Sequence, residues 1–196
     1  MHRKPDHDID PLFVRRWSPR SMTGEAIALE ELLRLFEAAR WSPSSSNRQP
    51  WRFVYALAGT PTFEPFVGLL APANAAWARK AGALVVVVAK TTTDDGKPSR
   101  LAASDTGAAW MALALQGTVQ ELVVHGMEGF DAAKAAALVQ MPADHEVLHM
   151  IAIGHRAPAE DLPEPYRERE QPNGRRPLAD LAFEGAFTPP PLSQTK

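Results

Sequence analysis

The sequence predicts an α+β fold in which one small sheet packs against a larger number of helices. Short apolar runs rich in β-branched residues are scattered along the chain, and the longer segments between them place apolar side chains at helical spacing. The chain has 196 residues and is 45% hydrophobic, which is enough for one packed core, so we predict a single domain over 1–196. The ends, 1–10 and 188–196, are expected to be flexible. The predicted strands are 52–58, 84–89 and 147–153, and the predicted helices are 29–40, 61–70, 74–80, 99–124 and 131–139.

In the first half of the chain, residues that start or stop secondary structure mark the element boundaries. The helix 29–40 alternates apolar and charged residues with helical period, and Ser42-Pro43 ends it. The segment 52–58 is rich in Phe, Val and Tyr, as strands are. Thr60-Pro61 is a favourable helix start, and a further helical piece follows over 74–80.

The second half contains the most apolar elements. The run 84–89 is entirely apolar, which is typical of a buried central strand. The segment 99–124 is Ala-rich and apolar on nearly all sides, so it predicts a long helix that another helix can approach closely, at the core of a dimer. Asp131 is the predicted N-cap of a short helix that extends to Val139. Gly154 ends the third strand.

Composition narrows the possible function classes. The net charge of -2 offers no basic excess for nucleic acid or an anionic membrane. The absence of Cys excludes disulfides and thiolate chemistry and fits a reducing compartment, so we expect a cytoplasmic protein. The start of the chain has no apolar signal segment, and the longest apolar run, 81–89, is too short for a membrane span. Neither a G-x-G-x-x-G motif nor a P-loop occurs.

Three polar segments are candidates for a binding site, and each also has an ordinary structural explanation. The segment 15–20 contains three Arg and one Ser, which suit a phosphate, but it also fits a solvated basic turn. The segment 40–51 is dense in hydroxyl and amide groups that could bind a heteroaromatic ring edge, but the same residues dominate turns. The segment 126–131 has two glycines that allow a close approach to a ligand, but it also fits a helix C-cap followed by an N-cap.

Taken together, in this order and spacing, these segments resemble the nitroreductase family of flavoenzymes. The resemblance covers about residues 15–187 and depends on five motifs: R-W-S-P-R from Arg16, P-S-S-S-N-R-Q-P-W-R-F from Pro43, N-x-x-W from Asn74, M-E-G-F-D from Met127, and R-R-P-L from Arg175. It implies a central mixed sheet flanked by helices, in an intertwined homodimer whose C-terminal extension crosses to the partner. In that arrangement, the segment 178–187 would add an edge strand to the partner's sheet.

The resemblance implies a non-covalent FMN site at the dimer interface. Arg16, Ser18 and Arg175 match phosphate contacts, with Trp17 between the first two, while Asn173 stands where many relatives have Lys. Arg20 and Asn74 match contacts to the pyrimidine edge of the flavin, and Trp77 replaces a second Lys found in some relatives. The remaining matches are Pro43, Ser44, Ser45 and Asn47 from the partner subunit, Met127 against one ring face, and the backbone N–H groups of Glu128 and Gly129 toward flavin N5 and O4.

The implied activity is an FMN-dependent NAD(P)H oxidoreductase that reduces nitroaromatics, quinones or similar small electron-poor acceptors in a ping-pong, two-electron cycle. No protein side chain is needed as a nucleophile or base, because flavin N5 carries the chemistry. The region 90–99 is short and polar, so we expect an open pocket and broad acceptor use. Reductive dehalogenation, flavin fragmentation, oxidation of small substrates and non-catalytic flavin binding remain alternatives on the same fold.

A zinc peptidase is the rival suggested by H-E-V-L-H from His145 to His149, with His155 downstream. On a helix, two His four residues apart share one face and can bind one Zn, whereas on a strand they lie ~13 Å apart. The β-branched residues around them and Gly154 favour a strand. We therefore expect no metal site there.

Overall fold

A computed structural model describes residues 3–187, and its core is a four-stranded sheet in the order β1-β2-β4-β3. The strands are β1 (Trp51–Leu57), β2 (Ala83–Lys90), β3 (Leu122–Met127) and β4 (His145–His155). The helices are α1 (Pro11–Arg15), α2 (Leu29–Arg40), α3 (Phe63–Val67), α4 (Pro72–Ala78), α5 (Ala102–Val119) and α6 (Ala132–Leu138). The observed architecture is α+β, and every predicted strand is present.

All strand pairs within the chain are antiparallel, so the expected mixed sheet is wrong for the single chain. A parallel pair needs a crossover connection that brings the chain back to the same end of the sheet. Here the crossover through α5 joins β2 to β3, but β4 lies between these two strands and pairs antiparallel with both, with β3 from Leu122–His155 to Met127–Met150. The central pair, β2 and β4, contains a bulge between Val87 and Val88.

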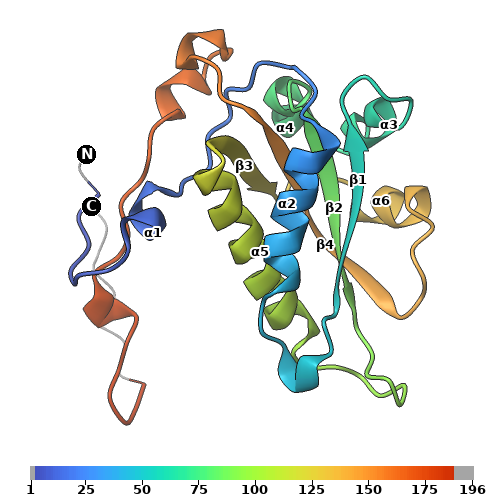
Figure 1. Cartoon of the computed structure of the whole chain (residues 1–196), viewed down its shortest axis with the longest axis vertical. Coiled ribbons are helices and arrows are strands. Elements are labelled where there is room, and N and C mark those ends of the chain that lie inside the picture. Colours follow the sequence, from blue (N-terminus) through green and yellow to red (C-terminus); the bar gives the residue numbers. More distant parts are fainter. Residues whose placement is uncertain (1–2, 188–196) are drawn as a thin grey trace.

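The sheet separates two layers of helices (Figure 1). On one face, α2 and α5 pack against alternate residues of β2 and β4, among them Val85 and Ile151, which are fully buried. On the other face, α3, α4 and α6 cover the residues between these, such as Val86 and Met150. The β2 strand is therefore apolar on both faces, as expected for a central strand.

The long helix is shorter than predicted. It was expected over 99–124, but α5 ends at Val119, and Glu121 turns the chain with a left-handed φ of 59°. The β-branched residues Val123 and Val124 then pair with β4 as the edge strand β3, which the sequence prediction missed. Helix 29–40 is confirmed, and Asp131 caps α6 by accepting a hydrogen bond from the Lys134 amide at 2.9 Å. Helix α3 lies within the predicted range 61–70. Helix α4 begins and ends two residues before the predicted range 74–80.

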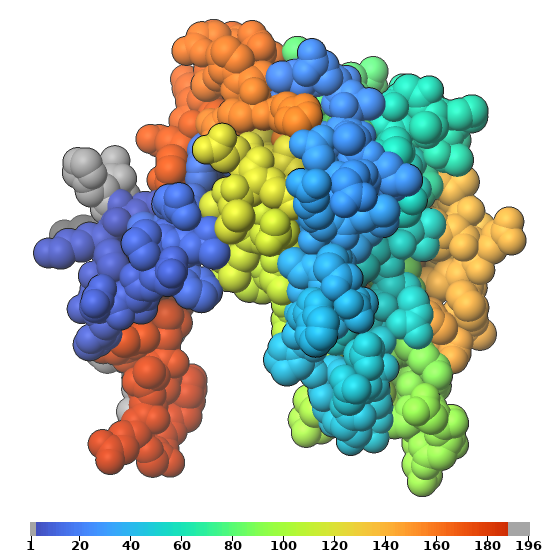
Figure 2. Space-filling model, viewed as in Figure 1, coloured from blue at the N-terminus to red at the C-terminus, as the bar shows by residue number. Residues whose placement is uncertain are grey.

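The N-terminal arm (3–15) lies beside the last part of the C-terminal segment (156–187), and both project from the body (Figures 1 and 2). The Arg3 side chain donates hydrogen bonds to the carbonyl groups of Val14 and Arg16, so part of the segment 1–10 is anchored. The segment 178–187 contains a 3₁₀ turn, Leu178–Asp180, and no strand. Its predicted pairing with a partner's sheet involves a second chain and stays a prediction. The expected flexibility of 188–196 concerns residues outside the described range.

None of the helices in the described range combines the length and the apolar character that a bilayer-spanning helix needs.

The close packing of α5 on β3 gives a first prediction. A Cβ at Gly117 would lie 2.2 Å from Cγ2 of Val124, so Gly117→Ala is expected to lower the free energy of unfolding by about 1–3 kcal/mol. Urea unfolding at a fixed protein concentration measures it. In a Val124→Ala background the same substitution is expected to cost under about 1 kcal/mol, because the clashing methyl is gone. An equal cost in both backgrounds would contradict this packing.

Candidate functional site

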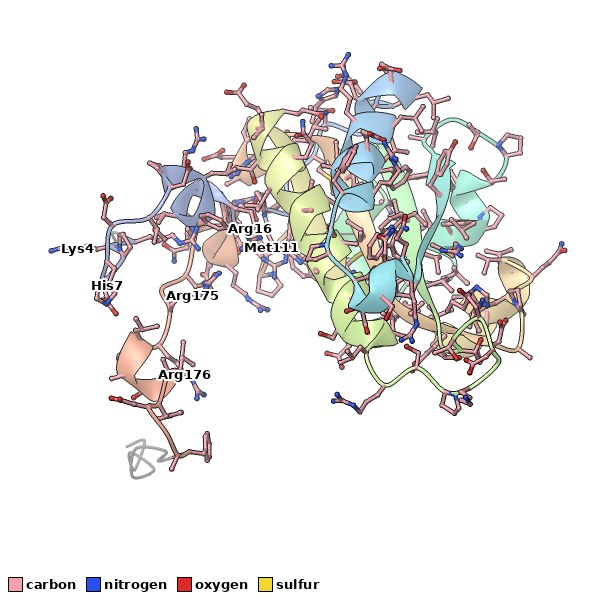
Figure 3. The ribbon with its side chains drawn as sticks, turned by 60° about the horizontal axis from the view of Figure 1, so that its bottom comes forward. Lys4, His7, Arg16, Met111, Arg175 and Arg176 are labelled. Carbon is pink, nitrogen blue, oxygen red and sulfur yellow. The ribbon has the colours of Figure 1, made fainter. Side chains whose placement is uncertain are left out.

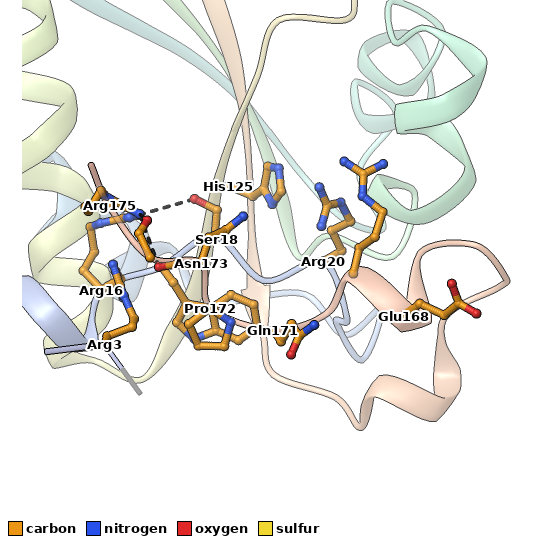
Figure 4. A pocket seen from close by; sticks show the side chains of 13 residues that line it. Arg3, Arg16, Ser18, Arg20, His125, Glu168, Gln171, Pro172, Asn173 and Arg175 are labelled. Carbon is orange, nitrogen blue, oxygen red and sulfur yellow. Dashed lines mark hydrogen bonds between the residues drawn. The ribbon is translucent and has the colours of Figure 1, made fainter. Parts of the chain in front are cut away.

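Three guanidinium groups converge at one end of a cavity of about 520 Å³ beside the free edge of the sheet. Arg16 follows helix α1, Arg175 comes from the C-terminal segment, and Arg3 comes from the N-terminal arm (Figures 3 and 4). Arg16 Nη1 donates to Ser18 Oγ at 3.3 Å. Desolvation lowers the pKa of Arg16, and the nearby charges of Arg175 and Arg3 lower it further. No carboxylate of the described residues forms a salt bridge with these three side chains, so the chemistry of this end of the cavity suits an anion.

The other end of the cavity is formed by Arg20 and His125. The Arg20 guanidinium lies 5.9 Å from the centre of the Trp77 ring, and Trp77 packs on His125 with ring centroids 4.6 Å apart. His125 Nδ1 is 2.8 Å from the carbonyl oxygen of Pro19, which ties the segment 16–20 to β3. Burial lowers the pKa of His125, so its ring is neutral at pH 7.

The backbone after β3 offers free hydrogen-bond donors. Among residues 3–187, the amide groups of Glu128 and Gly129 donate to no protein acceptor, whereas the Gly129 carbonyl accepts from the Ala71 amide at 3.0 Å and from Asn74 Nδ2 at 2.9 Å. A Cβ at position 129 would lie 2.8 Å from Asn74 Nδ2, so a side chain there would displace the Asn74 amide. Asn74 thus holds the Gly129 peptide in place, and its Oδ1 has no partner among the described residues.

A second cavity of about 550 Å³ adjoins the first and shares Arg16, Ser18 and Arg175 with it. Its wall is formed by Gly126 and His149 on the sheet and Trp110 on α5. The rings of Trp110 and His149 meet edge to face with centroids 5.3 Å apart. The Nε2 atom of His149 is buried and has no hydrogen-bond partner in the described part of the chain.

The loop before β1 has a strained backbone that is held by specific contacts. Ser46, Asn47 and Gln49 have φ values of 52°, 55° and 50°, in the left-handed region. Asp105 Oδ2 accepts a hydrogen bond from the Ser45 amide at 3.0 Å, and Ser44 Oγ accepts one from the Gln49 amide at 3.0 Å. Strain that the surroundings maintain in this way clusters at functional sites.

The structure brings most of the predicted site residues to the two cavities or beside them. Arg16, Trp17, Ser18, Arg20 and Arg175 line the first cavity, Met127 and Glu128 line the second, and Asn74 contacts Gly129 next to them. Met127 is only 3% exposed and packs mainly into the core. Pro43, Ser44, Ser45 and Asn47 line neither cavity in the single chain.

Sequence reasoning missed three residues of the site: Glu170, Arg169 and His149. The Glu170 carboxylate is fully buried and accepts hydrogen bonds from the Arg20 and Ser21 amides at 2.9 to 3.0 Å. Arg169 lines the first cavity. A charged run such as 167–170 usually indicates a solvated surface, so the sequence carried no signal for either one. His149 was considered only as a zinc ligand.

The H-E-x-x-H motif lies on a strand, as predicted. His145, His149 and His155 all belong to β4. In residues 3–187, no three His, Cys, Asp or Glu side chains gather as a metal ion requires.

The half-buried histidines His125 and His149 predict that stability falls in acid. Burial lowers the pKa of His125 and of His149 in the folded chain, so the unfolded chain binds more protons below about pH 6.5. Their contribution to stability is complete above that pH and is lost as the pH falls toward the folded pKa. We expect the free energy of unfolding to decrease from pH 7 to pH 5, and His149→Phe to flatten this slope. Replacing the exposed His7 with Gln is the control. An unchanged slope in His149→Phe would contradict the assignment.

Known proteins resemble this chain over most of its length. The model of the Nitroreductase family matches residues 14–155. The solved structure of an oxidoreductase containing FMN is 40% identical, with a TM-score of 0.92, and the alignment covers 96% of this chain and 97% of that one. A Desulfovibrio desulfuricans protein solved in complex with FMN is 25% identical, with a TM-score of 0.70, over 92% of this chain and all of that one. Protein DrgA of Synechocystis is 30% identical over 88% of this chain and 93% of its own length. The chain belongs to the nitroreductase family.

Proposed function

We propose that this protein binds FMN and uses it to transfer electrons from NAD(P)H to small electron-poor acceptors such as nitroaromatics and quinones. The observation that carries the proposal is the convergence of Arg3, Arg16 and Arg175 without a carboxylate, next to free backbone donors at the end of β3. A 40% identical protein is described as containing FMN, which supports the same cofactor here.

The residues present fit FMN. Arg16, Ser18 and Arg175 provide charge-assisted donors for a phosphate. The segment 16–20 runs from that anion site to Arg20, which lies beside β3 (Figure 4). The amides of Glu128 and Gly129 can donate to the polar edge of a flavin ring, and Asn74 keeps the Gly129 peptide oriented for this.

When bound, FMN supplies two-electron transfer between the donor and the acceptor. The chain's own contribution would be to bind the cofactor through Arg16, Ser18 and Arg175, to orient it, and to set the charge around it. No side chain is required as a nucleophile, which agrees with the neutral, half-buried histidines in the site.

We further propose that two copies of the chain complete the site. Exposed apolar side chains on the N-terminal arm, α5 and the C-terminal segment line a common groove. Among them are Phe13, Met111, Leu178 and Leu181, which are 38% to 60% exposed. Figure 3 labels Met111 on α5. Such a surface favours a partner of the same kind. The strained loop 43–47, which lines neither cavity of its own chain, would then approach the cavity of the partner.

Acceptor use is expected to be broad. The segment 91–98 folds into a tight turn on itself, with a bridge between Thr92 and Pro98 and a hydrogen bond from the Thr93 amide to Lys97. It lines neither of the two cavities at the edge of the sheet.

Anaerobic reduction tests the proposed function. The purified protein loaded with FMN is expected to show the visible flavin bands, and these bands should bleach when NADH or NADPH is added. The bleached protein should recover its bands with several nitroaromatics and quinones, because the short segment 91–98 covers neither cavity. Bound flavin that neither nucleotide bleaches would contradict the reductase proposal, and recovery with a single acceptor alone would contradict the open pocket.

A further inference from the structure

The first cavity contains more positive charge than one phosphate needs. Five arginines line it: Arg3, Arg16, Arg20, Arg169 and Arg175. A phosphate monoester carries roughly -1.5 to -2 charges at pH 7. The three arginines at one end are sufficient for such a group, which leaves Arg20 and Arg169 at the other end.

Arg20 and Arg169 bring like charges close together at this end of the cavity. Neither side chain forms a salt bridge or a hydrogen bond with any residue in the range 3–187. Desolvation is the largest cause that lowers the pKa of Arg20, and the Arg169 charge is the next largest. Glu168 also lines the cavity, but its carboxylate points away from Arg20 (Figure 4). Arg20 is half-buried and Arg169 is exposed. The charge of the buried Glu170 raises the pKa of Arg20 by less than the Arg169 charge lowers it, so the two like charges are not fully compensated within the described chain.

The backbone holds this pair in place. Arg169 directly precedes Glu170, whose buried carboxylate accepts hydrogen bonds from the Arg20 and Ser21 amides. Arg156 Nη2 lies 3.7 Å from the same carboxylate. One buried residue therefore fixes both the segment that carries Arg20 and the turn that carries Arg169.

The separation of the two ends indicates which part of a ligand meets the pair. The four-residue step from Arg16 to Arg20 contains no helix, and a fully extended chain of this length spans at most about 13 Å. A ligand whose phosphate binds at Arg16 would thus reach Arg20 with a group far from its phosphate. In FMN that group is the ring, and its pyrimidine edge becomes more negative when the ring takes up two electrons. Positive charge at this edge favours the reduced form.

We propose that Arg169, together with Arg20, forms the cationic contact for the pyrimidine edge of the flavin and raises the two-electron reduction potential of bound FMN. This inference rests on the proposed function. It gives the C-terminal segment two roles in the same chain: Arg175 would bind the phosphate, and Arg169 would raise the reduction potential of the flavin.

The test is the midpoint potential of bound FMN in the holoprotein, measured together with the dissociation constant of oxidised FMN. In Arg169→Gln, the affinity for oxidised FMN is expected to change less than about threefold. The affinity for reduced FMN relative to oxidised FMN should fall about tenfold, which is ~30 mV for a two-electron couple. Arg169→Lys keeps the charge and should retain most of the potential. Arg167→Gln is the matched control, since Arg167 pairs with Glu164 at 3.2 Å and lies outside the cavity.

Other results would overturn the inference. A wild-type potential in Arg169→Gln, with a raised Michaelis constant for the nucleotide donor, would place Arg169 at the electron donor instead of the flavin. An equal fall of the midpoint potential in Arg167→Gln would show that the effect comes from general surface charge and not from the cavity. Failure of the wild-type protein to bind FMN would refute the proposed function itself, and the inference with it.

Discussion

The buried carboxylate of Glu170 is the contact on which the geometry of the site depends. It accepts hydrogen bonds from two successive backbone amides, Arg20 and Ser21, and it lies near Arg156. These contacts join the C-terminal segment to the segment 16–20, although about 150 residues separate them in the chain. A buried carboxylate left without these partners would be costly, so the contact favours one arrangement of the two segments. In that arrangement Arg175 lies with Arg16 at one end of a single cavity, and Arg169 lies with Arg20 at the other end.

The second determinant is the open edge of the sheet. Because β3 is an outer strand, its end provides backbone donors that no neighbouring strand uses, and the segment 16–20 runs beside it. Asn74 and the absence of a side chain at Gly129 fix the last of these peptides. The sheet and helices thus form a rigid frame, while the charge of the site comes from irregular segments near both ends of the chain.

The sequence predicted what local patterns determine. Helix 29–40, the buried strand 84–89 and the Asp131 cap follow from periodicity and capping chemistry, and the structure contains all three. The strand β3 was missed because its apolar run continues that of α5, and only the left-handed turn at Glu121 separates them. Arg16, Ser18 and Arg175 were identified through motif resemblance. Arg169 and Glu170 were not identified, because the contact between residues 20 and 170 depends on tertiary packing and leaves no local pattern in the sequence.

The measurement that tests the account most directly compares the affinity of the protein for FMN and for riboflavin, which lacks the phosphate. If Arg16, Ser18 and Arg175 bind the phosphate, FMN should bind at least about a hundredfold more tightly than riboflavin, or about 2.7 kcal/mol. Arg16→Gln should remove most of this difference, and Arg15→Gln, one residue away on the exposed side of α1, should leave it intact. Equal affinity for the two flavins would contradict the assignment of the phosphate site, and with it the central claim.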